Sequence, residues 1–492
     1  MKTKKVFFFA IVFFVFLNAE IKYSHRGYFD LGTINRLSDG SMIKIPYRML
    51  TYDPTISYKN FYMITSTALE FRLKEINNIW GSNFDFHLRE LYLEWMTSIG
   101  EFSIGKQIIS WGSASANNPT DNISPYNYYY LFSEGKEQKE GILAFNSTLY
   151  FNDLKLNAIF IPKHETNILP LNDSEFLIST PITPNDEQIS MVENPYEFAL
   201  SISIPTQLLD ITTSYFSGYD RIMSFFGANV WTGQWSNPEA IKADTVLSFR
   251  HTDMFGLGLS TSLNDLSIKA DLGYFITTDN ASKGDSSLYR YFESGVEQII
   301  QECHDYNLIA QNTPFLQEIE NCNEDPAFNN SEAIDNSAKY YQLTFEIEYA
   351  PTFDFFMLGQ ITTSQLLEIG VADSINTSTG TIMFDPEEYF MPGMGAVNTF
   401  MSSTGNLLNS SSFSIIIQKT LPDVDLEFRY IGFYDLDKKG SINEFRMTYE
   451  LTDNLEIMGA INKIRGNKTI ENNQFSSMEA FSHVRLEVKY YY

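Results

Sequence analysis

Segments of about ten residues in which apolar and polar side chains alternate strictly recur along the chain, as in barrel strands. In 445–451, Phe445, Met447, Tyr449 and Leu451 alternate with polar residues of both charge signs. A period of two places the two kinds of side chain on opposite faces of a β-strand. Charges on the polar faces would be very costly in a dry protein core. The pattern therefore favours strands between hydrocarbon and water over amphipathic edge strands of a soluble sandwich.

Most of these segments occur in pairs joined by short turns. The seven pairs are 86–96 with 101–111, 141–151 with 154–161, 198–204 with 209–216, 255–262 with 266–277, 341–350 with 355–361, 413–419 with 424–434, and 445–451 with 455–463. Single segments at 23–33, 42–52 and 61–74 precede them, and 484–492 ends the chain. Pro46 weakens the segment 42–52, because proline cannot donate to a sheet ladder.

Long polar segments separate the pairs, at about 112–140, 162–196, 217–245, 278–339, 362–411 and 464–479. Short turns on one side and longer loops on the other are typical of outer-membrane barrels. No fixed-period repeat that would indicate a solenoid is visible. We therefore predict an all-β fold, a transmembrane antiparallel β-barrel of 16–18 strands with long extracellular loops and short periplasmic turns.

The first 19 residues have the layout of a secretory signal peptide. Lys2, Lys4 and Lys5 form a basic region, residues 6–17 are apolar, and the small residue Ala19 marks a cleavage site. The apolar run is shorter than the roughly 20 residues of a membrane-spanning helix. We expect a signal peptide at 1–19 and one barrel domain over 20–492. An exported chain with 40 Phe and 29 Tyr also fits the aromatic girdles of such barrels.

Composition and motifs exclude several function classes. A net charge of −27 argues against nucleic-acid binding, because phosphate contacts need clustered Lys and Arg. The six His are scattered, and no phosphate loop or Cys/His metal spacing occurs, so we predict no enzyme, cofactor or metal site. A barrel hydrolase stays open, since a Ser–His pair can assemble across strands. The segment 435–444 vaguely resembles a calcium loop, but Lys439 occupies a ligand position, and a polar hairpin turn is favoured.

The polar faces of the strands supply the candidate pore-lining residues. Lys106 is ambiguous, because it falls in the same set as the apolar Ile104 and would face lipid unless a bulge near Gly105 turns it inward or it lies near the interface. Turned inward, Lys106 and Gln107 would meet acidic residues of the partner strand, as a functional pair or as a network bracing the wall. The candidates are Glu90, Tyr92, Glu94, Lys106, Gln107, Asp425, Glu427, Arg429, Glu444, Arg446, Arg485 and Glu487.

A distinctive stretch runs from a Leu-Arg-Glu-x-Tyr strand through a Gly-Lys-Gln strand ending in Trp-Gly to an Asn-Pro-x-Asp loop. Its residues are Leu88, Arg89, Glu90, Tyr92, Gly105, Lys106, Gln107, Trp111, Gly112, Asn118, Pro119 and Asp121. This stretch, about 85–140, resembles porin-like and alginate-export-type large outer-membrane barrels, a family of mostly uncharacterised members. The resemblance implies a barrel but carries no alginate specificity, because that family's cationic selectivity residues have no match here.

The same resemblance implies a role for the terminal strand. In similar barrels, a closing strand that ends in an aromatic residue is a signal read by the barrel assembly machinery. The residues on its apolar face are Val484, Leu486, Val488, Tyr490 and Tyr492.

Two connections leave alternatives open. Trp111 and Gly112 end a strand, so Trp111 belongs either to an interfacial aromatic girdle or to a loop that folds inward as a constriction. Cys303 and Cys322 both lie in 278–339, and in an oxidising compartment a disulfide is expected for such a pair. That partly helical segment would be an outer loop, either plugging the pore or decorating the surface.

We predict a porin-like channel in the bacterial outer membrane for passive passage of small or medium-sized solutes through a charged, water-filled lumen. Net negative wall charge would favour cations or neutral solutes. The alternative is a non-conducting surface barrel that binds polysaccharide or a partner through aromatic loops such as the one from Tyr126. Expected partners are outer-membrane lipid and lipopolysaccharide, the barrel assembly machinery and a small-molecule solute. A homotrimer is expected only by analogy, because trimers are common among porins.

Overall fold

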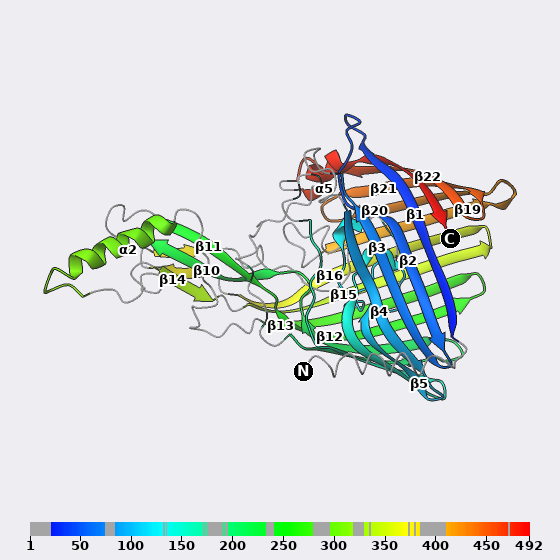
Figure 1. Cartoon of the computed structure of the whole chain (residues 1–492), viewed down its shortest axis with the longest axis horizontal. Coiled ribbons are helices and arrows are strands. Elements are labelled where there is room, and N and C mark those ends of the chain that lie inside the picture. Colours follow the sequence, from blue (N-terminus) through cyan, green and yellow to red (C-terminus); the bar gives the residue numbers. More distant parts are fainter. Residues whose placement is uncertain are drawn as a thin grey trace, which may run out of the picture.

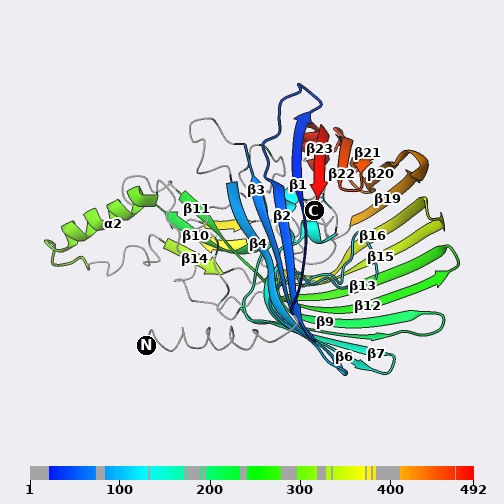
Figure 2. The same ribbon diagram turned by 45° about the vertical axis from the view of Figure 1, so that its right-hand side comes forward.

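Strand pairing runs around a complete circle, so that the main sheet is a closed antiparallel barrel of eighteen strands (Figures 1 and 2). The computed structural model describes residues 21–73, 84–130, 133, 135–170, 173, 175, 189, 192, 195–232, 241–278, 296–317, 329–333, 336–371, 374–377, 380–383, 410–470 and 473–492. The predicted signal peptide, 1–19, lies outside these residues. Among the described residues, no helix is long and apolar enough to cross a membrane.

The barrel strands follow the order of the chain, and each pairs with its neighbour in sequence. They are β1 (Lys22–Arg36), β2 (Tyr47–Tyr58), β3 (Phe61–Phe71), β4 (Phe84–Met96), β5 (Gly100–Gln107), β6 (Ile142–Phe151), β7 (Leu154–Ile161), β8 (Glu197–Ile204), β9 (Asp210–Tyr219), β12 (His251–Leu263), β13 (Leu266–Thr278), β15 (Asn336–Thr352), β16 (Phe355–Val371), β19 (Ser410–Leu421), β20 (Leu426–Asp435), β21 (Ser441–Thr452), β22 (Leu455–Arg465) and β23 (His483–Tyr491). The predicted fold class and strand number are confirmed.

The first and last strands close the barrel. β1 pairs with β2 on one side and with β23 on the other. The terminal residue continues the closure, because Tyr492 and Gly27 exchange two backbone hydrogen bonds of 3.1 and 3.2 Å. The Tyr492 hydroxyl also donates to the Thr51 carbonyl at 2.6 Å. A side chain at position 27 would meet the Thr51 carbonyl oxygen at 2.3 Å, so the close approach requires glycine.

Two strands begin at least two residues later than the alternation predicted. The segment 42–52 is not a strand throughout, because β2 begins at Tyr47, directly after Pro46, and continues to Tyr58. Proline offers no N–H to the ladder, and the sheet therefore starts beyond it. β20 begins at Leu426 rather than at residue 424, since Asp425 adopts a left-handed conformation with φ of 51°.

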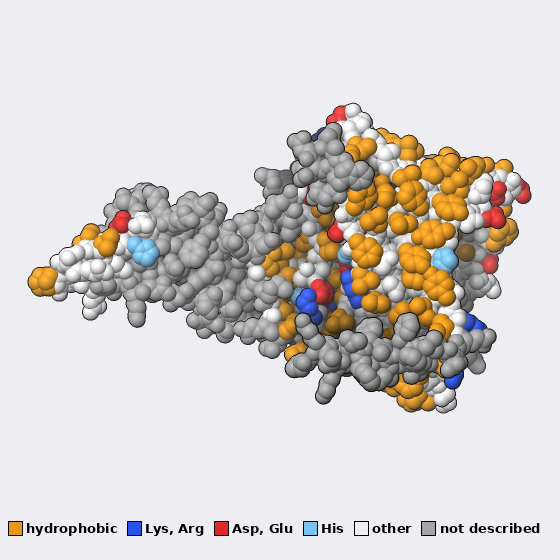
Figure 3. Space-filling view, viewed as in Figure 1, with side chains coloured by type: hydrophobic (Ala, Val, Ile, Leu, Met, Phe, Trp, Pro, Cys, Tyr) orange, Lys and Arg blue, Asp and Glu red, His pale blue; other side chains and the backbone are white. Residues whose placement is uncertain are grey.

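The outer surface of the barrel is apolar. In β4, Leu93 and Trp95 are 55% and 47% exposed, and in β23 the exposed residues include Leu486, Val488 and Tyr490. Figure 3 shows this apolar surface over the barrel strands, with charged side chains gathered near its margins. A soluble monomer rarely exposes so continuous an apolar surface, whereas a membrane barrel needs one. The barrel therefore has the outer surface of a membrane-spanning protein.

A β-bulge in β4 places two consecutive charged residues inside the barrel. Opposite β3, Glu90 pairs with Ser66 while Leu88 pairs with Thr67, so Arg89 is an extra residue without a partner position. Arg89 and Glu90 are both buried. The extra residue interrupts the alternation, which is how a bulge re-aims a side chain.

The register across β4, β5 and β6 places Lys106 on the outer face. Lys106 pairs with Leu91 and with Leu143, whose side chains are 43% and 50% exposed, and paired neighbours share a face. No register shift occurs at Gly105, and the prediction that Lys106 faces the lumen is wrong. Its ammonium group instead donates to the Leu88 carbonyl, 2.7 Å away, next to the bulge. This hydrogen bond lets a lysine occupy the outer face.

A small extension projects beyond the barrel wall. It contains a three-stranded sheet of β10 (Ser224–Thr232), β11 (Ile241–Ser248) and β14 (Asn329–Ala333), together with the helix α2 (Val296–Ala310). Figure 1 shows this extension leaving the barrel on the side opposite the short turns. The helix lies within the 278–339 connection. Cys322 and the side chain of Cys303 lie outside the described residues, so the disulfide stays a prediction.

The outer face generates a stability prediction. Met447, in the middle of β21, is exposed on the apolar side, while its neighbour Thr448 lines the interior. We expect Met447→Arg to lower the free energy of unfolding by about 2–4 kcal/mol in phospholipid vesicles, as a charge near the bilayer midplane does. Thr448→Arg, the matched control, should cost much less because its charge meets water. Urea unfolding followed by tryptophan fluorescence measures both, and equal losses would contradict an outer face in lipid.

Candidate functional site

The segment between β5 and β6, residues 108–141, folds into the barrel and is called the inward loop below. Its backbone N–H groups at Ser113 and Ala114 donate to the Asp271 carboxylate of β13, the latter at 2.6 Å. Those of Ser115 and Ala116 donate to Glu346 of β15, at 3.0 and 3.3 Å. These acceptors lie far from β5 around the barrel, so the loop crosses the lumen. Of the two alternatives for this connection, the structure has the inward constriction.

The two carboxylates can hold the loop backbone because they are completely buried. Asp271 and Glu346 have no exposed surface, and a buried carboxylate needs hydrogen-bond donors or a countercharge. Loop N–H groups supply most of the donors, and Glu346 also accepts from Gln360 at 2.7 Å and lies 3.4 Å from the Lys269 ammonium. Wall side chains therefore take the hydrogen bonds that the loop backbone would otherwise make to water.

Arginines of the opposite wall hold the returning half of the inward loop. Arg48 of β2 and Arg89 of β4 bind the two carboxylate oxygens of Glu137, at 2.6 and 3.0 Å. The Arg48 guanidinium also lies 3.7 Å from the centre of the Tyr130 ring, a cation–π contact. Burial would raise the pKa of Glu137, but the charges of Arg89 and Arg48 outweigh it and lower that pKa. Glu137 is therefore ionised near neutral pH and fixes the loop to β2 and β4.

A third attachment is a buried charged cluster at the ends of β7, β8 and β9. Arg221 donates to the Glu197 carboxylate at 2.7 Å and to the Ile123 carbonyl of the inward loop at 2.8 Å. His164 Nδ1 lies 2.7 Å from the same carboxylate. Nδ1 lies also 3.1 Å from the Arg221 guanidinium. An ionised carboxylate only accepts hydrogen bonds, so the 2.7 Å contact with Glu197 requires a proton on Nδ1, which then cannot also accept from Arg221.

Burial lowers the pKa of His164, with the Arg221 charge adding to this effect and the Glu197 hydrogen bond opposing it. Its Nε2 is buried and has no hydrogen-bond partner. Protonation there would create a buried donor without an acceptor. The neutral imidazole is thus the form that this cluster accommodates.

The inward loop seals one side of the lumen with apolar side chains. Ile109 and Ile123 of the loop pack against inward-facing residues of β6, β7, β8, β9, β12, β13 and β15. These wall residues are Ile142, Ala144, Ile159, Ile161, Ala199, Phe216, Met254, Phe275, Ala338 and Tyr340. Water and solutes are excluded from the space that this apolar cluster fills.

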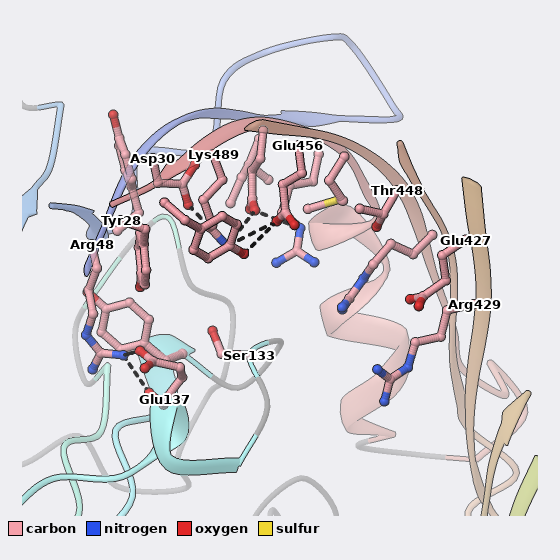
Figure 4. Close-up of a pocket in the computed structure, with 18 of the residues that line it drawn as sticks. Tyr28, Asp30, Arg48, Ser133, Glu137, Glu427, Arg429, Thr448, Glu456 and Lys489 are labelled. Carbon is pink, nitrogen blue, oxygen red and sulfur yellow. Dashed lines mark hydrogen bonds and ion pairs between the residues drawn. The ribbon is translucent and has the colours of Figure 1, made fainter. Parts of the chain in front are cut away.

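The other side of the lumen keeps a cavity of about 580 Å³ between the loop and the strands β1, β2 and β20–β23. Figure 4 shows its geometry, with Arg48 and Glu137 on one side and Glu427 and Arg429 of β20 on the other. Its charged lining residues are Asp30, Arg48, Glu137, Asp425, Glu427, Arg429, Arg446, Glu450, Glu456, Arg485, Glu487 and Lys489. Seven are acidic and five are basic, so the lining is polar with a small negative excess.

A ladder of ion pairs runs along the β21–β23 side of this cavity. Arg446 binds Glu444 at 2.7 Å, and Arg485 lies 3.6 Å from the same carboxylate. Arg485 is also 3.4 Å from Glu487, which is 3.9 Å from Lys489. In register, Arg429 stands directly opposite Arg446. Two cations side by side in a water-accessible wall are tolerable only because carboxylates flank them.

The structure divides the predicted pore-lining residues into groups. Glu427, Arg429, Arg446, Arg485 and Glu487 line the cavity, and Glu444 lies beneath them, buried between two arginines.

Other candidates lie away from this cavity. Glu90, Tyr92 and Glu94 share the inner side of β4, and Glu90 accepts a hydrogen bond from the Ile108 N–H at 2.8 Å. Gln107 is buried and accepts from the Ser103 hydroxyl at 2.7 Å. Asp425 borders the cavity from the turn before β20 and not from a strand.

Several residues that organise the site were missed from the sequence. Asp271 and Glu346 stand on the polar faces of alternating segments, so the pattern alone predicts that they point inward. That they bind loop N–H groups could not be predicted, because nothing in a strand pattern identifies a partner more than 150 residues away. His164 and Arg221 lie in connections, where no periodicity applies.

The calcium-like segment 435–444 covers the end of β20, the turn 436–440 and the start of β21. The Asp435 carboxylate accepts hydrogen bonds from the N–H groups of Asp437 and Lys438 at 3.0 and 2.7 Å. In the described part of the chain, no group of three or more His, Cys, Asp or Glu side chains is arranged to hold a metal ion.

No protein-family model matches the sequence, and no curated protein is detectably similar to it. Among solved structures, OccK8 (OprE) of Pseudomonas aeruginosa is similar with a TM-score of 0.49 and 13% identity, over 96% of this chain and 98% of that chain. OccAB1 of Acinetobacter baumannii has a TM-score of 0.46 and 10% identity, over 96% and 97%. A BenF-like porin from Pseudomonas fluorescens Pf-5 has a TM-score of 0.45 and 9% identity, over 96% and 98%.

The attachment of the inward loop generates one prediction. Asp271→Asn replaces an acceptor-only carboxylate by an amide whose N–H₂ group faces loop donors, so the loop should loosen. We expect larger and noisier single-channel currents than in the unmodified protein. Glu427→Gln, a carboxylate change on β20 in the cavity wall, should leave current noise unchanged. Quiet, unchanged currents in Asp271→Asn would show that this carboxylate does not hold the constriction.

The buried imidazole generates a pH prediction. Since the folded protein lowers the pKa of His164, the unfolded chain binds the proton more readily, and stability should fall as pH drops below about 6.5. In His164→Gln, this part of the pH dependence should be absent. Urea unfolding at pH 7.5 and at pH 5.5 measures the difference for both proteins. Identical pH dependence in the two would mean that His164 is not held neutral.

Proposed function

We propose that the protein is a porin-like channel of the bacterial outer membrane, through which small or medium-sized solutes pass passively. The observation that carries this proposal is the cavity between the inward loop and β20–β23. A closed barrel with an apolar outside must have a polar or filled inside, and here the loop leaves part of the interior open. Charged residues line the remaining opening, and such a lining is favourable in water and very costly in a dry interior.

The inward loop would set the size of the solutes that pass. Its attachments to Asp271, Glu346, Arg48, Arg89 and Arg221 reach both sides of the barrel, so it acts as a fixed constriction rather than a swinging lid. Fixed pores discriminate by diameter and by the charge of the lining. A constriction of this kind would admit solutes of small or medium size and exclude larger ones.

The charge of the lining supports a weak preference for cations or neutral solutes. The small negative excess at the opening acts over short distances, because salt screens charges beyond about 8–10 Å. Arginines on β20, β21 and β23 oppose this excess locally. Selectivity should therefore be modest.

The non-conducting surface barrel is less well supported than a channel. The aromatic loop from Tyr126 was its main motif, yet Tyr128 and Tyr130 are buried inside the barrel, so this loop is not a surface for partners. One observation still favours it, namely the extension with α2, where Leu308, Ile309 and Phe315 are exposed. Conductance measurements separate the two functions.

Further proposals concern catalysis, the surrounding membrane and the partners of the barrel. We propose no catalytic role for the barrel. Outer-membrane lipid and lipopolysaccharide would surround it, the barrel assembly machinery would read its terminal strand, and a homotrimer remains a proposal by analogy. The resemblance of 85–140 to alginate-export-type barrels adds the barrel class and no particular cargo.

Single-channel recording in planar lipid bilayers tests the channel. We expect the unmodified protein to conduct, with a reversal potential in a salt gradient that indicates weak cation preference. Arg446→Gln removes a cation from the lining and should strengthen that preference, whereas Glu427→Gln should weaken it. Well-folded barrels without conductance would exclude the channel, and identical reversal potentials in the two variants would exclude this cavity as the path.

A further inference from the structure

On the strands that face the sealed side of the inward loop, the inward-facing side chains change from small hydroxyl residues to apolar residues. In β8, Ser203 and Ser201 come first from the short-turn end, and Ala199 follows on the same face. In β9, Thr212 and Ser214 are followed by Phe216. The apolar residues belong to the seal beneath the loop, whereas the small hydroxyl residues continue beyond it toward the short turns.

These hydroxyl residues line a second cavity of about 280 Å³, separate from the charged opening. We call it the hydroxyl pouch and define it by Trp111, Asn157, Ser201, Ser203, Thr212 and Ser214. The Trp111 Nε1 donates to the Asn157 side-chain oxygen at 3.0 Å, which fixes the indole ring in the pouch wall. No residue of the pouch lines the charged cavity.

The pouch offers hydrogen-bonding groups that the protein does not use itself. The hydroxyls of Ser201 and Ser214 bind no other described residue, while Thr212 donates to Ser203 at 3.0 Å. Two charged residues border the pouch. The Asp271 carboxylate is occupied by loop N–H groups, and Lys155 stands next to the 152–153 turn, exposed. The other polar side chains that line the pouch are hydroxyls and amides, so its interior is polar, with one carboxylate and one ammonium group at its border.

We propose that the hydroxyl pouch binds a neutral polyhydroxylated solute of monosaccharide size. Hydroxyl groups both donate and accept hydrogen bonds, so a wall of Ser and Thr matches a ligand that carries hydroxyls on every side. The indole of Trp111, which lines the pouch, adds apolar surface for a sugar ring. The volume of about 280 Å³ lies just below the roughly 300–1,000 Å³ of ligand pockets, which favours one sugar unit over a chain.

The pouch lies on the short-turn side of the constriction, where a solute arrives after passing the loop. This access rests on the proposed channel function, but binding itself does not require conductance. In detergent, both ends of the barrel are open to solution. The binding test therefore stands apart from the conductance test.

Isothermal titration of the purified full-length protein in detergent with D-glucose tests the proposal. We expect saturable binding to the unmodified protein. Ser214→Leu fills the pouch and removes a hydroxyl, and it should weaken binding by about tenfold or more. Thr448→Leu makes a similar change in the charged cavity and should leave binding unchanged. Thr212→Val, nearly isosteric, provides a second pouch variant if Ser214→Leu does not fold, as judged by heat-modifiable electrophoretic mobility.

Three results would overturn the proposal. These are no saturable heat with glucose, equal binding in the pouch variants and the unmodified protein, and binding of glucose 6-phosphate alone, lost in Lys155→Gln. The last result would assign the pouch to anions. A protein that binds glucose but carries no current would disprove the channel and leave the pouch standing, so the two failures are distinguishable.

Discussion

Hydrocarbon provides no hydrogen bonds, and the rest of this structure follows from that constraint. A sheet in lipid must pair every backbone group, so it can have no free edge. Here the circle closes between β1 and β23 and continues to the last residue, where Tyr492 pairs with Gly27. The closed wall then separates an apolar outside from an interior in which charged side chains meet water.

The interior raises a second problem, because an eighteen-stranded wall encloses more space than its own side chains fill. The inward loop occupies part of it, and buried carboxylates rather than apolar contacts alone fix its backbone. The buried carboxylates of Asp271 and Glu346 need hydrogen-bond donors, and the N–H groups of the loop need acceptors. The hydrogen bonds between them satisfy both. The loop leans toward β6–β15, and this asymmetry leaves the charged opening beside β20–β23 and the hydroxyl pouch beneath the seal.

The strands and their faces could be predicted from the sequence because alternation is a local property of the chain. Pairs such as β12 with β13 therefore lie close to their expected positions. Alternation placed Lys106 on the outer face, and the prediction failed because it assumed a bulge at Gly105, whereas the bulge lies at Arg89. The inward loop was left as an alternative to a girdle, since its direction depends on acceptors contributed by β13 and β15. Local patterns predict the wall, but contacts distant in sequence decide what fills it.

The distance in sequence between the inward loop and its acceptors has a consequence for biogenesis. Ser113 lies 158 residues before Asp271, and Ser115 lies 231 residues before Glu346. During synthesis and insertion, the loop exists well before the strands that will hold it, and contacts so distant form slowly. Until β13 and β15 have been made, the carboxylates that fix the loop do not exist. The constriction can therefore take its final form only once β13 and β15 are in place.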